Sequence, residues 1–231
     1  MDIAKVHPEE SSRPWILHSA KTKAEKDGDI GSWSPSQVID FHNKLDRTPR
    51  NHRELAELAV LRFLDLKDDL EHGDSSVSDI LRTVTQETEM RKFIGRELRE
   101  KAFGRYSIPQ EEELADAKRP DLRFHGVNFD GPIPVELKLA DNKWGGPKLF
   151  ERLENQLCGD YLRDNRSNRG IFVLVYRGDK KGGWDVPGCD NRLDFARLTS
   201  ALQEHWKKIS PKFPNVDDVT VIGIDLTKRS S

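Results

Sequence analysis

From Gly104 onward, short segments rich in β-branched and alternating residues are separated by stretches with helical spacing, and this alternation restricts the fold more than any other feature. The segments that read as strands are Leu122 to His125, Ile133 to Leu139, Ile171 to Tyr176 and Val219 to Leu226. The helical stretches between them are Pro147 to Arg163 and Asn191 to Ile209. Strands interleaved with helices in this order predict an α/β domain with a mixed central sheet that helices flank.

The residues before this region favour helices without strands. Helices are expected over Pro35 to Phe41, Asn51 to Glu71, Val77 to Val84 and Glu87 to Ala102. Residues 1–34 show no sustained period, so we expect them to form an extension that is flexible or docks on another surface. The sequence therefore suggests an extension over 1–34, a helical region over 35–84 and an α/β domain over 85–231.

Composition and charge exclude several classes of protein. The 38 Lys and Arg nearly balance the 40 Asp and Glu, which excludes a uniformly basic nucleic-acid coat but allows a local basic face. The longest apolar runs have about six residues, too few for a helix that spans a bilayer, and residues 1–15 lack a signal-peptide core. Cys158 and Cys189 have no metal-site spacing and read as reduced thiols. We expect a cytoplasmic protein without a membrane partner.

The residues suited to chemistry lie at Asp121 and, from thirteen residues later, in the strand over 134–139. Side chains alternate faces along a strand, so Glu136 and Lys138 point to one side together. Asp121 lies beside Glu136 if the two strands pair. Two carboxylates and a backbone carbonyl, that of Leu137, form the oxygen site that Mg²⁺ or Mn²⁺ prefers. With the Lys138 ammonium beside them, they suit phosphodiester hydrolysis.

The (Asp/Glu)-x-Lys triplet alone carries little information, because it occurs five times in this chain. A strand with a solvated Glu and Lys face is the simpler interpretation of Glu136 and Lys138. Only this occurrence, however, lies inside a convincing strand and follows a Pro-Asp, which favours the chemical interpretation.

Pro120-Asp121 followed by Glu136-Leu137-Lys138 resembles the signature of the PD-(D/E)xK nuclease superfamily, in which Glu-x-Lys lies on the strand after Pro-Asp. Gln156 and Tyr161 on the next helix are similar to an accessory motif of its exonuclease-like and recombination-nuclease branches. Those branches have three residues between Gln and Tyr, whereas this chain has four, which on an α-helix turns Tyr161 by about 100°. We therefore expect Gln156 to fix a phosphate or a water on the metal, and Tyr161 to pack differently.

Glu87 resembles a further Glu that the superfamily often carries on the helix before its first strand. It precedes Met90 and Ile94 by three and seven residues, on the side expected to be buried, where a metal site would explain a carboxylate. The alternative is an acidic residue that the helix dipole favours in the first turn. Glu89 is the other candidate on this helix.

The resemblance covers about residues 85–226 and implies a restriction-endonuclease-like core and a metal-dependent endonuclease that hydrolyses DNA. It assigns catalysis to Asp121, Glu136, Lys138, Gln156 and Glu87, and Mg²⁺, which Mn²⁺ can replace, to Asp121, Glu136 and the Leu137 carbonyl. A narrower likeness of residues 134–138, 156–164 and 170–173 to C-terminal nuclease domains of bacterial anti-phage defence proteins implies an antiviral effector. An associated sensor or NTPase partner would switch it on.

Basic residues follow the proposed site in the sequence. Residues 138–181 hold ten Lys and Arg against six Asp and Glu. We expect contacts with the DNA backbone from Lys143, Lys148, Arg163, Arg166, Arg169 and Tyr161. A solvated surface of mixed charge is the alternative for each basic residue.

Two other functions remain open. One is a non-catalytic binding module that kept the fold, against which the intact Asp121, Glu136 and Lys138 argue. The other is an assembly subunit in which residues 1–84 bind a partner or form a homo-oligomer, and nuclease activity arises only in the complex.

Overall fold

The structure is a computed structural model that describes residues 14, 16–21, 33–41, 48–74, 76–109, 120–141, 144–163, 166 and 168–228. The chain divides into two compact units, Met1–Asp46 and Arg47–Ser231. The first unit contains helix α3 (Pro35–Phe41), as the sequence predicts. The side chains of Trp33, Val38 and Ile39 on and beside α3 are exposed.

The second unit is built on a five-stranded mixed sheet in the order β1-β2-β3-β4-β5. Its strands are β1 (Tyr106–Ser107), β2 (Leu122–Gly126), β3 (Ile133–Leu139), β4 (Arg169–Tyr176) and β5 (Asp218–Asp225). β2 is antiparallel to both β1 and β3, whereas β3, β4 and β5 run parallel. The predicted α/β class with a mixed sheet is confirmed. β1 was not expected, because two residues are too few to show a period.

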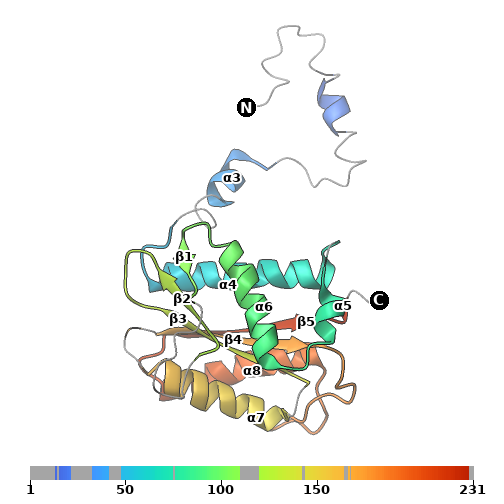
Figure 1. Ribbon diagram of the computed structural model, residues 1–231, viewed down its shortest axis with the longest axis vertical. Coiled ribbons are helices and arrows are strands. Elements are labelled where there is room, and N and C mark those ends of the chain that lie inside the picture. The colour runs from blue at the N-terminus through green and yellow to red at the C-terminus, as the bar shows by residue number, and fades with distance from the viewer. Residues whose placement is uncertain are drawn as a thin grey trace. The chain divides into compact units, whose positions relative to one another are not determined.

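Helices cover both faces of this sheet (Figure 1). The helical segments of this unit are α4 (His52–His72), α5 (Ser78–Arg82), α6 (Glu87–Glu100), α7 (Gly146–Glu151), η3 (Arg152–Tyr161), α8 (Phe195–Ile209) and η4 (Ser210–Lys212). One core joins α4 and α6 to Val135, Leu137 and Leu139, and the other joins α7, η3 and α8 to Phe172 and Leu174. A strand between two helical layers is buried on both sides, which explains why β3 has no exposed residue.

Helix α4 belongs to the same compact unit as the sheet. Leu55, Ala59 and Phe63 are fully buried on its apolar side, where they join the core that contains β3. The division between units therefore falls after residue 46, whereas the sequence suggested boundaries after 34 and 84. The leucine spacing reveals a stripe that must be buried, but it does not say which surface buries it. None of the helices in the described part of the chain is long and apolar enough to cross a membrane.

The helix expected over 147–163 changes its winding after Glu151. α7 is an α-helix, but η3 is a π-helix, in which the N–H of each residue bonds five positions back, as Leu162 N does to Leu157 O at 3.0 Å. This winding takes up the extra residue between Gln156 and Tyr161. The expected turn of Tyr161 by about 100° assumed α-helical geometry, whereas the π-helix brings Tyr161 Oη within hydrogen-bond distance of Gln156.

Candidate active site

Strand pairing brings the two expected carboxylates together. Leu122 of β2 pairs with Val135 of β3, so Asp121, one residue before β2, lies across from Glu136. The Leu137 amide donates a hydrogen bond to Asp121 Oδ2 at 2.8 Å, which fixes that carboxylate against β3. Glu136 and Lys138 point to the face opposite Val135 and Leu137, as the alternation requires.

Lys138 is the centre of this carboxylate cluster, which we define as Glu87, Asp121, Glu136 and Lys138. Its Nζ lies 2.7 Å from Glu87 Oε1, 2.5 Å from Glu136 Oε1 and 3.7 Å from Asp121 Oδ2. It also donates to the Leu137 carbonyl at 2.9 Å. The cluster therefore joins one ammonium to three carboxylates that come from α6, the start of β2, and β3.

Glu87 enters the cluster from the first turn of α6. Besides its contact with Lys138, it accepts a hydrogen bond from the Leu139 amide at 3.3 Å. Glu89, the other candidate on α6, is exposed. The carboxylate that the structure brings to the cluster is therefore Glu87.

Burial and crowding disturb the ionisation of the cluster. Burial raises the pKa of Glu136 to about 7, and the Asp121 carboxylate adds to the rise despite the Lys138 ammonium. The pKa of Asp121 is also raised, mainly by burial. Burial opposes the charge of Lys138, but Asp121, Glu136 and Glu87 together outweigh it and raise the pKa of the ammonium. The positive charge of Lys138 is thus secured at neutral pH.

The donor types in the cluster fit a hard divalent cation. Glu136 is fully buried, and its Oε2 has no hydrogen-bond partner among the described residues, which costs free energy unless a cation compensates it. Asp121, Glu136 and the Leu137 carbonyl supply oxygen ligands of the kind Mg²⁺ takes. As arranged, however, the described chain has no group of three His, Cys, Asp or Glu side chains ready to hold a metal. Lys138 Nζ lies among the oxygens instead.

Gln156 and Tyr161 form a chain of hydrogen bonds beside the cluster. Arg152 Nη1 donates to Gln156 Oε1 at 2.9 Å, and Gln156 Nε2 donates to Tyr161 Oη at 2.6 Å. Burial raises the pKa of Tyr161 to about 12, and the charges of Glu136 and Asp121 contribute to the rise. Lys138 and Arg152 both lie against the Trp144 ring, which brings this chain of hydrogen bonds to the edge of the cluster.

Two contacts of the cluster were missed by the sequence reasoning. Arg91 Nη1 lies 3.5 Å from Asp121 Oδ1, and the Trp144 ring lies 5.7 Å from Lys138 Nζ and 5.2 Å from Arg152 Cζ. Arg91 could have been found, because it follows Glu87 by four residues and so shares its face of α6. The position of Trp144 depends on the loop after β3, for which the sequence gives no comparable signal.

The basic residues expected to contact DNA lie on several elements of the unit. Lys148 and Arg163 are exposed on α7 and after η3, and Lys143 lies outside the described residues. Arg166 Nη1 lies 3.5 Å from Asp130 Oδ2, and Arg169 Nε lies 3.8 Å from Asp217 Oδ2. Arg169 is the first residue of β4. Leu174, which pairs with Lys138, lies near the other end of that strand.

No protein-family model matches the chain, and no curated protein or solved structure matches it. The interpretation of the site therefore depends on its own geometry and chemistry.

Proposed function

We propose that this protein is a metal-dependent endonuclease that hydrolyses the phosphodiester bonds of DNA. The observation that carries the proposal is the convergence of Glu87, Asp121 and Glu136 on the Lys138 ammonium at one buried point. A surface strand with solvated charges would not bury these groups. The separation of 51 residues between Glu87 and Lys138 also argues against a purely local ion pair.

The order of elements supports a restriction-endonuclease-like core. α6 is followed by the antiparallel strands β1, β2 and β3, then by α7 and η3, then by β4 parallel to β3. This is the order of helix, three strands, helix and strand that the resemblance implies. It places the Glu-x-Lys on a central strand and the Gln156-to-Tyr161 motif on the following helix.

Each residue has a role that follows from its surroundings. Asp121, Glu136 and the Leu137 carbonyl would hold Mg²⁺ or Mn²⁺, which when bound supplies Lewis acidity toward a phosphoryl oxygen. Lys138 lies beside these ligands, where it would stabilise negative charge on the phosphate and orient or help deprotonate the attacking water. Gln156 positions a phosphate oxygen or a water through its amide.

A second candidate is a nuclease subunit that becomes active only with a partner, for example the effector of an anti-phage defence system. The exposed Trp33, Val38 and Ile39 in the unit over Met1–Asp46 favour it, because exposed apolar side chains on and beside one short helix suit an interface. The partner would be a sensor, an NTPase or a second copy of the chain.

The test is cleavage by the purified protein of supercoiled plasmid, linear duplex, single-stranded DNA and RNA, with Mg²⁺, Mn²⁺ or EDTA. We expect DNA to be cut with either metal and to stay intact in EDTA. Cutting that persists in EDTA would overturn the metal-dependent mechanism. Absence of cutting with both metals would favour the partner-dependent candidate.

A further inference from the structure

A basic groove with a volume of about 720 Å³ lies between α6, Pro109 and the residues Asp121 and Leu122 at the start of β2. Its walls include Arg91, Lys92, Arg96 and Arg99 of α6, together with Asp121 and Leu122. One end of the groove thus reaches Asp121, a member of the carboxylate cluster. All four cations come from a single helix, none of whose basic residues was among the expected DNA contacts.

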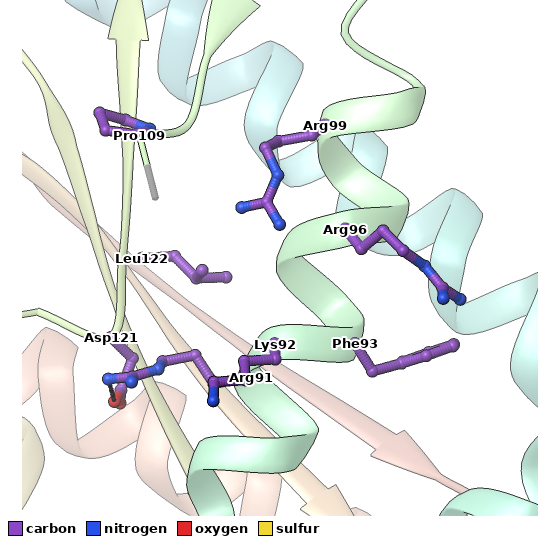
Figure 2. Close-up of a pocket in the computed structure, with 8 residues that line it drawn as sticks. All are labelled: Arg91, Lys92, Phe93, Arg96, Arg99, Pro109, Asp121 and Leu122. Carbon is purple, nitrogen blue, oxygen red and sulfur yellow. Dashed lines mark ion pairs between the residues drawn. The ribbon is translucent and has the colours of Figure 1, made fainter. Parts of the chain in front are cut away.

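The cations of the groove differ in where they point (Figure 2). Arg91 reaches across to Asp121, and Arg99 extends from α6 toward Leu122, inside the groove. Arg96 points the opposite way, where it pairs with Glu97 at 2.9 Å and lies over the Phe93 ring at 5.5 Å. Arg99 therefore contributes its charge to the groove, whereas Arg96 directs its charge elsewhere.

Arg99 and Lys92 retain charge that the described protein does not neutralise. Neither forms an ion pair with a carboxylate among the described residues, although α6 also carries Glu97 and Glu100. Arg99 lies over Gly95, where an added Cβ would meet Arg99 Nη1 at 3.3 Å and Leu122 Cδ2 at 3.0 Å. The missing side chain leaves room for the guanidinium and for Leu122 beside the helix.

We propose that this groove binds the phosphate backbone of the DNA strand and directs it to the carboxylate cluster. The proposal rests on the proposed function. Arg99, Lys92 and Arg91 contact phosphates in that order along the strand, with Arg91 at the phosphate nearest Asp121. The nine residues from Arg91 to Arg99 span ~12 Å of helix, about the rise along the duplex axis of three or four phosphates of one strand of B-form DNA.

Backbone phosphates are the ligand that this chemistry favours. Guanidinium groups pair with phosphate oxygens in a bidentate way, and such contacts give affinity without reading sequence. Where the DNA strand meets the three carboxylates, a cation is needed between the negative charges of the phosphate and of the carboxylates. The proposed metal ligands at that end of the groove agree with this need. The groove therefore supplies the positive surface that the nearly neutral chain lacks overall.

The test measures binding of a fluorescent 30-nucleotide duplex by anisotropy, in EDTA so that the metal-dependent reaction is prevented. Arg99→Glu and Lys92→Glu should each weaken binding at least tenfold. Lys207→Glu, the same charge change at an exposed position of α8 outside the groove, should weaken it less than twofold. Arg99→Ala should also lower the slope of log Kd against log salt by about one. Equal loss in the Arg99→Glu and Lys207→Glu proteins would overturn the groove.

Two controls separate the possible failures. If Arg99→Glu lowers the melting temperature, the exposed Lys92→Glu decides the question. Inorganic phosphate, added at the concentration of DNA phosphate in the assay, should not displace the duplex. Full displacement would overturn a groove that binds several phosphates of one strand. Cleavage with Mg²⁺ is measured in parallel. Equal binding by the Arg99→Glu and Lys207→Glu variants, together with DNA cleavage by the wild-type protein, rejects the groove alone. A selective binding loss in a protein that never cleaves rejects the nuclease alone.

Discussion

Lys138 Nζ lies 2.7 Å from Glu87 Oε1, although β3 and the start of α6 are separated by 51 positions in the chain. The contact fixes the first turn of α6 against the end of β3, where Asp121 and Glu136 also meet. It therefore ties the helix that carries the basic groove to the strand that carries the proposed catalytic lysine.

Replacement of Glu87 tests whether this contact serves catalysis. Glu87→Gln should reduce DNA cleavage by about 10- to 100-fold, because a hydrogen bond to a charged group is worth about 1.5–3 kcal/mol. Glu89→Gln removes the same charge from an exposed position of the same turn and should leave the rate unchanged. Equal rates for the two variants in single-turnover assays would remove Glu87 from the site.

Replacement of two fully buried glutamates, Glu136 and Glu71, should change the stability of the protein in opposite directions. Burial raises the pKa of Glu136 to about 7, so the folded state holds the proton more tightly than the unfolded state. The free energy of unfolding should therefore fall as pH rises from about 4.5 to about 7. Glu136→Gln should stabilise the protein at pH 8 by up to about 3 kcal/mol, and the gain should vanish below pH 4.5.

Glu71 is the matched control, because its carboxylate is equally buried but well paired. Burial opposes its charge, yet hydrogen bonds from Lys228, Lys67 and the Asp225 amide outweigh burial and lower its pKa. Its contribution to stability is therefore present above about pH 4.5 and lost at lower pH. Glu71→Gln should destabilise the protein at pH 8 by about 1–3 kcal/mol. Urea unfolding at pH 4 and pH 8 measures both variants, and a loss of stability in Glu136→Gln at pH 8 would contradict the account.

The Tyr161 hydroxyl tests the role of the π-helix. Tyr161→Phe removes the group that accepts from Gln156 Nε2 and should lower stability by about 1 kcal/mol and cleavage several-fold. Tyr106→Phe removes a hydrogen bond to the Leu98 carbonyl within the other core, so it should cost similar stability without affecting cleavage. If both variants keep the wild-type rate, the Gln156–Tyr161 pair only supports the structure.

The sequence predicted the elements that carry a clear period. The bounds of β3 agree with the expected Ile133 to Leu139, and the side-by-side position of Asp121 and Glu136 follows from the pairing of two short strands. The alternation of side chains along a strand and the turn between neighbouring strands are local properties, so both can be read from the sequence.

Features that depend on tertiary packing were not accessible in this way. The π-helix over Arg152–Tyr161 has no distinct residue signature, and its effect is visible only in the contact of Gln156 with Tyr161. Arg91 could not be linked to the site by nearness to Lys138 in the sequence, because α6 brings it to Asp121 from 30 positions away. Distance along the chain was thus a poor guide to the charges around the site.

The most direct test of the central claim is the rate of Mg²⁺-dependent plasmid cleavage by Lys138→Met compared with Lys181→Met. Both variants remove the lysine of an (Asp/Glu)-x-Lys triplet, but Lys138 lies in the cluster and Lys181 is exposed on a loop. The account predicts cleavage by wild type and by Lys181→Met at the same rate, and a loss of at least 100-fold in Lys138→Met. Wild-type cleavage by a folded Lys138→Met protein would contradict it.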